Sequence, residues 1–212
     1  MFIGYYGISV LLTYIGVASS VIGMMFAFFN HIPVAIMCLI ISGICDMFDG
    51  TVARACKRSE REKKFGIQID SLADCICYGA FPVVIGICMG FNGIFCKITY
   101  VIYALAAVIR LAYFNVLAEE KESKKIFNKS VEDKNYYYGL PVTSIAIILP
   151  FTYNLHIFLG PNIFNKAYPL IMLVTAILFV LNIKIKKPTG IWFVICSILA
   201  AIEIAIISAS IR

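Results

Sequence analysis

The amino-acid sequence predicts an all-α fold, a polytopic bundle of transmembrane helices. Of its 212 residues, 61% are hydrophobic and only 14% are charged, and the mean hydropathy is +0.91. A soluble domain of this length has too small an interior for so many apolar side chains. The apolar residues gather in seven stretches without the alternation of barrel strands, and backbone groups in lipid must then be satisfied within helices.

Each apolar stretch is expected to form one helix of a single domain over residues 1–212. A helix needs about 20 residues to cross the hydrocarbon core, and most stretches approach this length, although the sixth is shorter. The first stretch lacks the basic residues that open a signal peptide and is expected to be a retained helix. The predicted helices cover residues 8–29, 33–55, 67–90, 95–118, 139–158, 167–183 and 191–210.

Basic residues are concentrated in alternate connections. The second, fourth and sixth connections hold thirteen Lys or Arg residues, whereas the first, third and fifth hold two. Because Lys and Arg are retained on the cytoplasmic side, these connections and the N-terminus are predicted to be cytoplasmic. Most of these cations only fix topology, but they also suit anionic headgroups and an anionic nucleotide. The thirteen are Lys57, Arg58, Arg61, Lys63, Lys64, Lys121, Lys124, Lys125, Lys129, Lys134, Lys184, Lys186 and Lys187.

Four aspartates lie near the cytoplasmic ends of the second and third predicted helices. Asp46 and Asp49 fall in the last turns of the second helix, and Asp70 and Asp74 in the first turns of the third. Residues three or four positions apart share a helical face, so each helix offers two carboxylates to a common cleft. Carboxylates at this depth need a positive partner, and Mg²⁺ or Mn²⁺ favours oxygen ligands and leaves positions for substrate phosphates. The sequence therefore predicts a divalent-metal site.

Small residues and an arginine accompany the acids. Gly50 and Ala53 leave the acidic face of the second helix without bulk, and Gly66 does the same on the third, so a ligand can approach the backbone. Arg54, one turn beyond the acids, is placed to hold a phosphate through a forked pair of hydrogen bonds. Gly50 or Gly66 alone would indicate only close helix packing. Their fixed offsets from four acids favour ligand binding.

The complete pattern, D-x2-D-G-x2-A-R-x11-G-x3-D-x3-D, resembles the signature of the CDP-alcohol phosphatidyltransferases. The resemblance implies an enzyme that uses two divalent ions to displace CMP from a CDP-linked lipid by an alcohol. It also implies a homodimer and six family helices, so the seventh predicted helix is an additional one at the C-terminus. An alcohol is a poor nucleophile at neutral pH, and a carboxylate and metal cluster can supply charge neutralisation, positioning and a general base.

The same resemblance implies a role for each signature residue. Asp46, Asp49 and Asp70 would be metal ligands. Asp74 would contact a metal and also be the catalytic base that accepts the hydroxyl proton. The CDP-lipid would be bound by Asp49, Gly50, Ala53, Arg54 and Gly66.

Segments outside the signature resemble the phosphatidylserine synthase branch of this family. They are SLADCICYGAFP at 71–82, IRLAYFNV at 109–116, YGLP at 138–141 and KIKKP at 184–188. The resemblance implies transfer of a phosphatidyl group from CDP-diacylglycerol to L-serine at the cytoplasmic side of the cell membrane. The sequence departs from the branch at Leu12, Thr13 and Tyr14, where an Asn-rich segment is expected.

Arg110 and Asn115 are the candidates for a serine site. Arg110 is predicted eight residues before the end of the fourth helix, at the depth of the aspartates. It requires an anionic partner: an aspartate, the CDP-lipid phosphate or the serine carboxylate. The bidentate fit of guanidinium to carboxylate favours serine. Asn115 would support serine binding or form a hydrogen bond at its helix end, because five positions along it turns away from Arg110.

Two alternative functions stay open. Glycerol phosphate or inositol phosphate is the alternative acceptor, but its phosphate would need more basic residues deep in the cleft than Arg54 and Arg110. A divalent-cation transporter would also contain intramembrane acids. A transporter has no use for Gly50, Ala53 and Arg54 at fixed offsets, and acids gathered at one face offer no path across the membrane.

The remaining cysteines and polar residues give less specific functional predictions. The eight cysteines show no C-x2-C pair or zinc spacing, and we interpret them as reduced core residues. No nucleic-acid-binding module is recognisable, so the expected partners are membrane lipids and the two substrates. Glu203, in the last predicted helix, has three interpretations: pairing across a helix contact, pairing across a dimer contact, or a protonated side chain.

Overall fold

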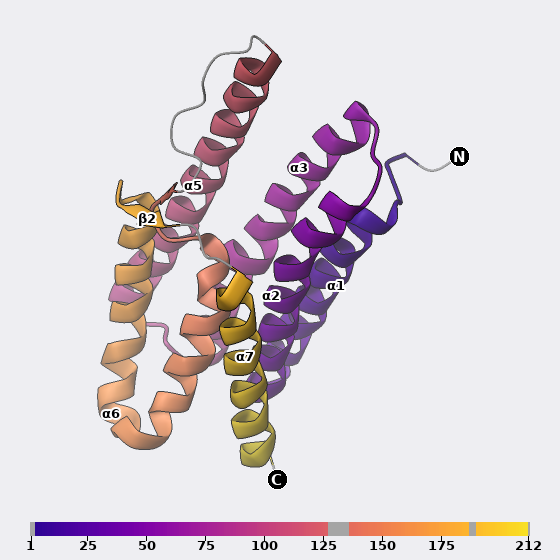
Figure 1. Ribbon diagram of the computed structural model, residues 1–212. Helices are drawn as coiled ribbons and strands as arrows, with labels where there is room; N and C mark the ends of the chain where they lie inside the picture. Colours follow the sequence, from indigo (N-terminus) through magenta and orange to yellow (C-terminus); the bar gives the residue numbers. More distant parts are fainter. Residues whose placement is uncertain (1–2, 127–135, 187–189, 212) are drawn as a thin grey trace.

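The protein is helical throughout, apart from one pair of three-residue strands (Figure 1). The computed structural model describes residues 3–126, 136–186 and 190–211, and each of the seven predicted stretches is helical. The elements are α1 (Ile8–Phe28), α2 (Ile32–Ala55), α3 (Glu60–Asp74), the π-helix η1 (Cys75–Ala80), α4 (Phe81–Cys88), α5 (Ile94–Ile126), β1 (Tyr136–Tyr138), the 3-10 helix η2 (Val142–Ser144), α6 (Ile145–Val180), β2 (Lys184–Lys186) and α7 (Gly190–Ile211).

Five helical segments of the described chain are long and apolar enough to cross a membrane. Two further apolar helices, Val142–His156 and Cys196–Ser208, are shorter. The chain is therefore a multi-pass membrane protein, and the predicted all-α transmembrane bundle is confirmed. The long spans are Val10–Phe28, Ile32–Ala55, Glu60–Cys88, Ile94–Glu120 and Ile163–Val180.

The predicted fifth and sixth helices are two arms of α6. The backbone leaves helical geometry at Gly160, where φ is 68° and ψ is 161°. Glycine adopts positive φ without the steric cost that other residues meet, so the chain can reverse here. Figure 1 shows α6 running toward one end of the bundle and returning beside α5. The bend keeps both arms within one small bundle.

The ends of the elements alternate across the bundle. The start of α1, the α2–α3 connection and the last turns of α5 lie at one end, and α7 finishes at the other (Figure 1). Strands β1 and β2 pair antiparallel and join the fourth and sixth connections on one side. The strands were not predicted, because each is only three residues long and a strand is recognised from an alternating pattern over about four to eight residues. Lys129, Lys134 and Lys187, which entered the orientation argument, lie outside the described residues.

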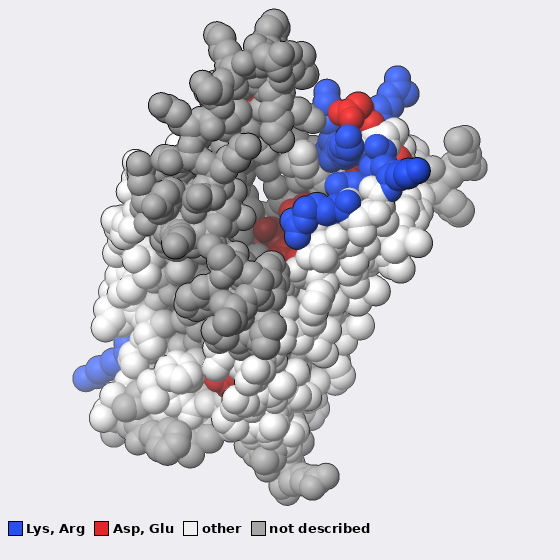
Figure 2. Space-filling view, in the orientation of Figure 1, with Lys and Arg blue, Asp and Glu red and all other residues white. Residues whose placement is uncertain are grey.

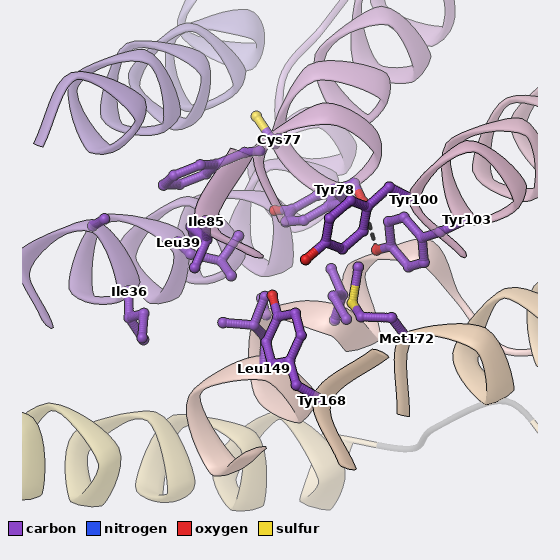
Figure 3. Close-up of a cluster of buried hydrophobic side chains, with 14 of the residues drawn as sticks. Ile36, Leu39, Cys77, Tyr78, Ile85, Tyr100, Tyr103, Leu149, Tyr168 and Met172 are labelled. Carbon is purple, nitrogen blue, oxygen red and sulfur yellow. Dashed lines mark hydrogen bonds between the residues drawn. The ribbon is translucent and has the colours of Figure 1, made fainter. Parts of the chain in front are cut away.

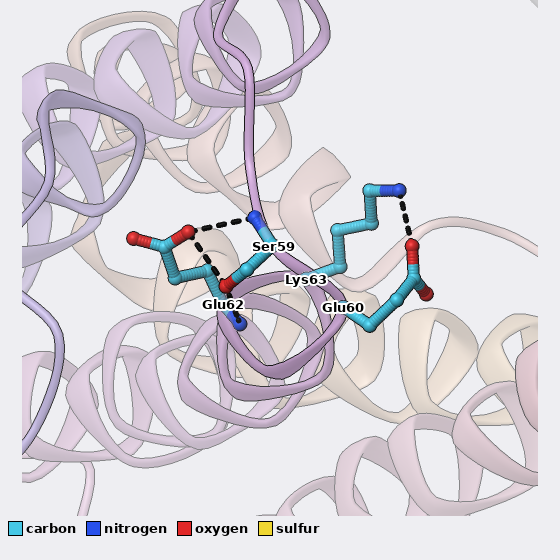
Figure 4. A network of polar contacts seen from close by, with 4 residues as sticks. All are labelled: Ser59, Glu60, Glu62 and Lys63. Carbon is cyan, nitrogen blue, oxygen red and sulfur yellow. Dashed lines mark hydrogen bonds and ion pairs between the residues drawn. The ribbon is translucent and has the colours of Figure 1, made fainter.

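Helix α3 begins seven residues earlier than predicted. Ser59 and Glu62 form a capping box, in which the Glu62 carboxylate accepts from Ser59 N at 2.7 Å and Ser59 Oγ accepts from Glu62 N at 3.3 Å (Figure 4). An exposed ion pair of 2.7 Å between Lys63 and Glu60 lies beside it. These polar residues extend the helix beyond its apolar part. The placement of Asp70 and Asp74 in its first turns is therefore wrong, because Asp74 ends α3.

A π-helical turn follows Asp74 directly. Pro82 has no N–H to donate to the carbonyl of Tyr78, four residues earlier. The buried hydroxyl of Tyr103 donates to that carbonyl at 2.7 Å instead (Figure 3). This bond joins η1 to α5 and satisfies both groups in the interior. Single π-helical turns are frequent at functional sites, and this one begins directly after the last residue of the signature.

The core lies where η1, α4 and α5 meet α2 and α6. Figure 3 shows large side chains of these elements converging, and Tyr103, Tyr168 and Phe81 are almost fully buried. Cys38, Cys45, Cys77 and Cys96 are buried and the other four cysteines are half-buried, which agrees with their interpretation as packing residues. Among the helices at the far end, Asn154 of α6 donates a hydrogen bond to buried Glu203 of α7. The structure thus places Glu203 in a contact between two helices, as one of the three interpretations predicted.

Candidate functional site

A cavity of about 610 Å³ opens between α2, α3, α5 and the start of α6. All four aspartates, Asp46, Asp49, Asp70 and Asp74, line it. Cys196 of α7 also contributes to its wall. Figure 2 shows acidic side chains in a hollow beside the basic side chains of the α2–α3 connection. The cavity therefore combines buried and half-buried carboxylates with a basic rim.

The carboxylates of α2 and α3 pair with one another at the cavity wall. Asp46 lies within hydrogen-bonding reach of Asp74, and Asp49 lies within reach of Asp70. Regular helix in both elements explains this arrangement, since each pair of acids is separated by three or four positions. The structure thus brings together the acids that the sequence assigned to a common cleft. Like charges this close repel one another strongly unless a cation or a shared proton intervenes.

The acidic cluster fits a divalent ion. One ligand oxygen from each of Asp46, Asp49 and Asp70 lies within 4.8 Å of the others. Oxygens around Mg²⁺ stand about 2.0–2.1 Å from the ion, so those of one shell are at most about 4.2 Å apart. The hard oxygen donors and the adjoining cavity suit an ion that keeps positions for a substrate, so these three aspartates form a cluster that can hold a metal ion.

Each of the two signature glycines lies beside an arginine side chain. A Cβ added at Gly50 would stand 3.7 Å from Arg54 Nη1, and one added at Gly66 would stand 3.3 Å from Arg58 Nη1. Gly50 and Arg54 line the cavity, whereas Ala53 and Gly66 are outside the lining found among the described residues. Arg54 is exposed and donates to Thr51 Oγ1 at 3.1 Å. A guanidinium group therefore lies close to the backbone at each signature glycine, where a Cβ would be in contact with it.

Arg110 enters the same cavity from α5, where it is buried. Its Nη1 donates to the carbonyl oxygen of Phe179 at 3.2 Å, and its Cζ lies 4.5 Å from the centre of the Phe114 ring. The charge of Asp74 also acts on Arg110. The backbone contact was not among the predicted partners, because the C-terminal end of α6 approaches α5 only in the folded chain. A cation is favourable beside a helix C-terminus.

Asn115 also lines the cavity, and it has a hydrogen-bond partner that the sequence did not predict. Ser71 Oγ of α3 donates to Asn115 Oδ1 at 2.7 Å. The alternative of a helix-end hydrogen bond is wrong, because α5 continues to Ile126 and Asn115 lies well inside it. The contact joins α3 and α5 across the cavity. Arg110 and Asn115 thus lie on one wall despite their five-residue spacing.

Several lining residues were missed in the sequence. Ser71 lies one position after Asp70, Phe114 lies four after Arg110, and Thr143 lies two after Pro141. Helical spacing from Arg110 would have indicated Phe114, and Ser71 falls inside a segment already singled out. Thr13 of α1 donates to Asp49 Oδ2 at 3.0 Å, although no signature position lies on that helix. Its contact had no local sequence signal.

Comparison with known proteins agrees with this geometry. The sequence profile described as CDP-alcohol phosphatidyltransferase matches residues 7–199. The chain is 34% identical over 116 residues to the CDP-diacylglycerol--serine O-phosphatidyltransferase of Saccharomyces cerevisiae, covering 54% of this chain and 40% of that protein.

Two bacterial proteins with the same name show similar likeness. The Helicobacter pylori (strain 26695) protein is 32% identical over 140 residues, which cover 62% of this chain and 52% of that protein. The Mycobacterium tuberculosis (strain H37Rv) protein is 27% identical over 180 residues, which cover 83% and 59%. The chain therefore matches about half the length of these relatives. Since the profile spans nearly the whole chain and the acids of its signature converge on one cavity, the protein belongs to the CDP-alcohol phosphatidyltransferase family.

Proposed function

We propose that the protein is a phosphatidylserine synthase, which transfers a phosphatidyl group from CDP-diacylglycerol to the hydroxyl of L-serine and releases CMP. The observation that carries the proposal is the single cavity that holds four carboxylates of α2 and α3 opposite a buried arginine of α5. The names of the curated relatives support serine as the acceptor. The proposal treats residues 1–212 as one catalytic domain.

Asp46, Asp49, Asp70 and Asp74 are proposed to hold two divalent ions, Mg²⁺ or Mn²⁺. Bound ions would neutralise charge on the phosphate oxygens of the CDP-lipid. Arg54, which lines the cavity beside Gly50, would hold a phosphate of the same substrate. The family signature also assigns Ala53 and Gly66 to this substrate. The assignments of the aspartates, Gly50 and Arg54 rest on their convergence on one cavity and on the signature, and those of Ala53 and Gly66 rest on the signature alone.

Asp74 is proposed as the general base. It lies at the end of α3, on the cavity wall, and close enough to Arg110 for the two charges to interact. Asp74 would accept the proton of the serine hydroxyl while the serine oxygen bonds to the phosphorus atom of the phosphatidyl group. The bond from that phosphorus to the CMP oxygen breaks, and CMP leaves. A base beside the acceptor is what a weak alcohol nucleophile requires.

Arg110 and Asn115 are proposed to bind serine. The guanidinium offers five N–H donors in one plane, and the contacts with Phe179 and Phe114 fix the direction of that plane. A carboxylate matches this fork through two parallel hydrogen bonds. The amide of Asn115, oriented by Ser71, supplies a further polar group on the same wall.

Release of CMP from the purified protein tests the proposed function. The protein in mixed micelles with CDP-diacylglycerol and Mn²⁺ receives serine, glycerol 3-phosphate or inositol phosphate in separate reactions. Of the three acceptors, we expect only serine to cause CMP release. An Asp70→Asn variant prepared in the same way should release no CMP with serine. Faster release with either phosphorylated acceptor would reject serine, and no release with any acceptor would reject the transferase assignment.

The active site is proposed to face the cytoplasm. Arg61 lies in the first turn of α3, Lys166 lies six residues after the break of α6 at Gly160, and both are exposed. In a background without reactive native cysteines, Arg61→Cys should react with a membrane-impermeant thiol reagent only from the cytoplasmic side, and Lys166→Cys only from outside. The reversed labelling pattern would reject this orientation. The proposed homodimer, which the family resemblance implies, is tested by light scattering of the solubilised protein.

Arg110→Lys is expected to raise the KM for serine by roughly 10-fold or more. Lysine exchanges a planar fork for a single point charge, and the lost charged hydrogen bond is worth about 1.5–3 kcal/mol. The KM for CDP-diacylglycerol should change little. Arg54→Lys is the matched control and should raise the lipid KM rather than the serine KM. Equal increases of both constants in Arg110→Lys would show that Arg110 serves the aspartates or the lipid phosphate.

A further inference from the structure

Helix α1 supplies a buried polar contact to the acidic cluster. Thr13 Oγ1 donates a hydrogen bond of 3.0 Å to Asp49 Oδ2. The two residues are only 8% and 9% exposed. They lie 36 positions apart, so the contact exists only because α1 packs along α2. A buried hydroxyl that reaches a carboxylate of a candidate metal cluster is well placed to control the direction of that carboxylate.

The Asp49 carboxylate accepts hydrogen bonds from two donors outside the acidic cluster. Besides Thr13, the backbone N–H of Gly50 donates to it. An ionised carboxylate offers about four acceptor positions, so two donors leave the remaining positions for the cluster. Those positions face Asp46 and Asp70, whose oxygens lie within 4.8 Å of the Asp49 ligand oxygen. The two donors thus hold the Asp49 carboxylate while its remaining acceptor positions stay available to a metal ion.

Little else can replace the Thr13 hydroxyl. The space behind the aspartates, lined by Thr13, Gly16 and Ser42 among others, has a volume of about 10 Å³. One water molecule needs about 10–15 Å³ of this kind of space. Removal of the Thr13 hydroxyl therefore leaves Asp49 with room for a single water at most, and a water held in this way constrains the carboxylate less than a side chain on a packed helix.

We propose that Thr13 is a positioning residue for the metal site. Its hydrogen bond holds Asp49 in the rotamer that directs the other carboxylate oxygen toward Asp46 and Asp70. Groups that orient a metal ligand typically change metal affinity or activity by about 10- to 100-fold when removed. The inference rests on the proposed function only for the binding of a divalent ion, and is independent of the acceptor alcohol.

Binding of Mn²⁺ to the protein without substrates tests this role. Electron paramagnetic resonance of free Mn²⁺ measures the dissociation constant directly. Thr13→Val keeps the side-chain shape and removes the donor, and should weaken Mn²⁺ binding roughly 10-fold. Thr13→Ser restores the hydroxyl and should bind Mn²⁺ within a few-fold of the wild type. Thr13→Ala repeats the test if the valine variant does not fold.

Ser19→Ala is the matched control. Ser19 Oγ donates to the carbonyl of Cys38 at 2.9 Å, so this change also removes an α1–α2 hydrogen bond but touches no aspartate. Its Mn²⁺ affinity should equal that of the wild type. Equal weakening in Ser19→Ala and Thr13→Val would assign the effect to helix packing and overturn the proposal. Unchanged Mn²⁺ affinity in Thr13→Val would overturn the positioning role of Thr13 and leave the metal site standing. A wild-type protein that does not bind Mn²⁺ would reject both the positioning role and the metal site.

Discussion

Asp70→Asn should abolish turnover and weaken binding of the divalent ion. The substitution is nearly isosteric but removes one negative charge and one ligand oxygen from the cluster with Asp46 and Asp49. A metal ion contributes several kcal/mol of charge stabilisation to phosphoryl transfer, which corresponds to a rate loss of about a thousandfold or more. CMP release and Mn²⁺ binding, measured on the same preparation, check both parts of the prediction.

Glu60→Gln is the control for this change. Glu60 lies on the same helix and pairs only with Lys63 at the surface, so loss of its charge should change activity and Mn²⁺ binding little. If Asp70→Asn lost activity but bound Mn²⁺ as tightly as the wild type, Asp70 would not be a metal ligand. Loss of folded protein would be visible as aggregation in size-exclusion chromatography, and it would have to be absent for the comparison to count.

Asp74→Asn should lower the reaction rate much more than the affinity for the CDP-lipid. If Asp74 removes the hydroxyl proton, the variant loses about 100-fold or more in rate, because asparagine cannot accept that proton. Binding of the CDP-lipid should fall much less, since Asp46, Asp49 and Asp70 keep their cluster. Single-turnover CMP release measures the rate, and equilibrium binding of CDP-diacylglycerol in the absence of serine measures the affinity.

Asp46→Asn provides the comparison for Asp74→Asn. Asp46 lies opposite Asp74 within hydrogen-bonding reach and belongs to the metal cluster, so its substitution should reduce binding and rate together. An Asp74→Asn variant that kept more than a tenth of the wild-type rate would contradict the general-base assignment, because such a loss is smaller than a base normally contributes. Parallel losses of rate and lipid binding in both variants would make Asp74 a metal ligand only.

The acidic cleft was predictable because its parts are local. The offsets within 46–54 and within 66–74 are short enough for helical period alone to place them on one face. Apolar composition then indicated two adjacent membrane helices, and adjacent helices of a bundle bring their faces together. The convergence of the carboxylates on one cavity agrees with that reasoning. Their catalytic roles stay predictions until the variants are measured.

Features that depend on helix ends were harder to predict. The hydropathy pattern placed the start of the third helix at residue 67, because it follows apolar residues, whereas the Ser59–Glu62 capping box extends α3 through a polar turn. The π-helix after Asp74 was missed for a related reason. It depends on Pro82 and on a hydroxyl donated by Tyr103 from another helix, and neither feature has a hydrophobic signal.

Membrane character, seven helical stretches and the acidic signature thus followed from the amino-acid sequence alone, since hydropathy and helical period act over a few turns. Three contacts made by cavity-lining residues, in contrast, required the folded chain. Thr13 meets Asp49 across 36 positions, Ser71 meets Asn115 across 44, and Arg110 meets the carbonyl of Phe179 across 69. Such contacts depend on how whole helices pack, and no local pattern encodes the angle and depth at which two distant helices meet.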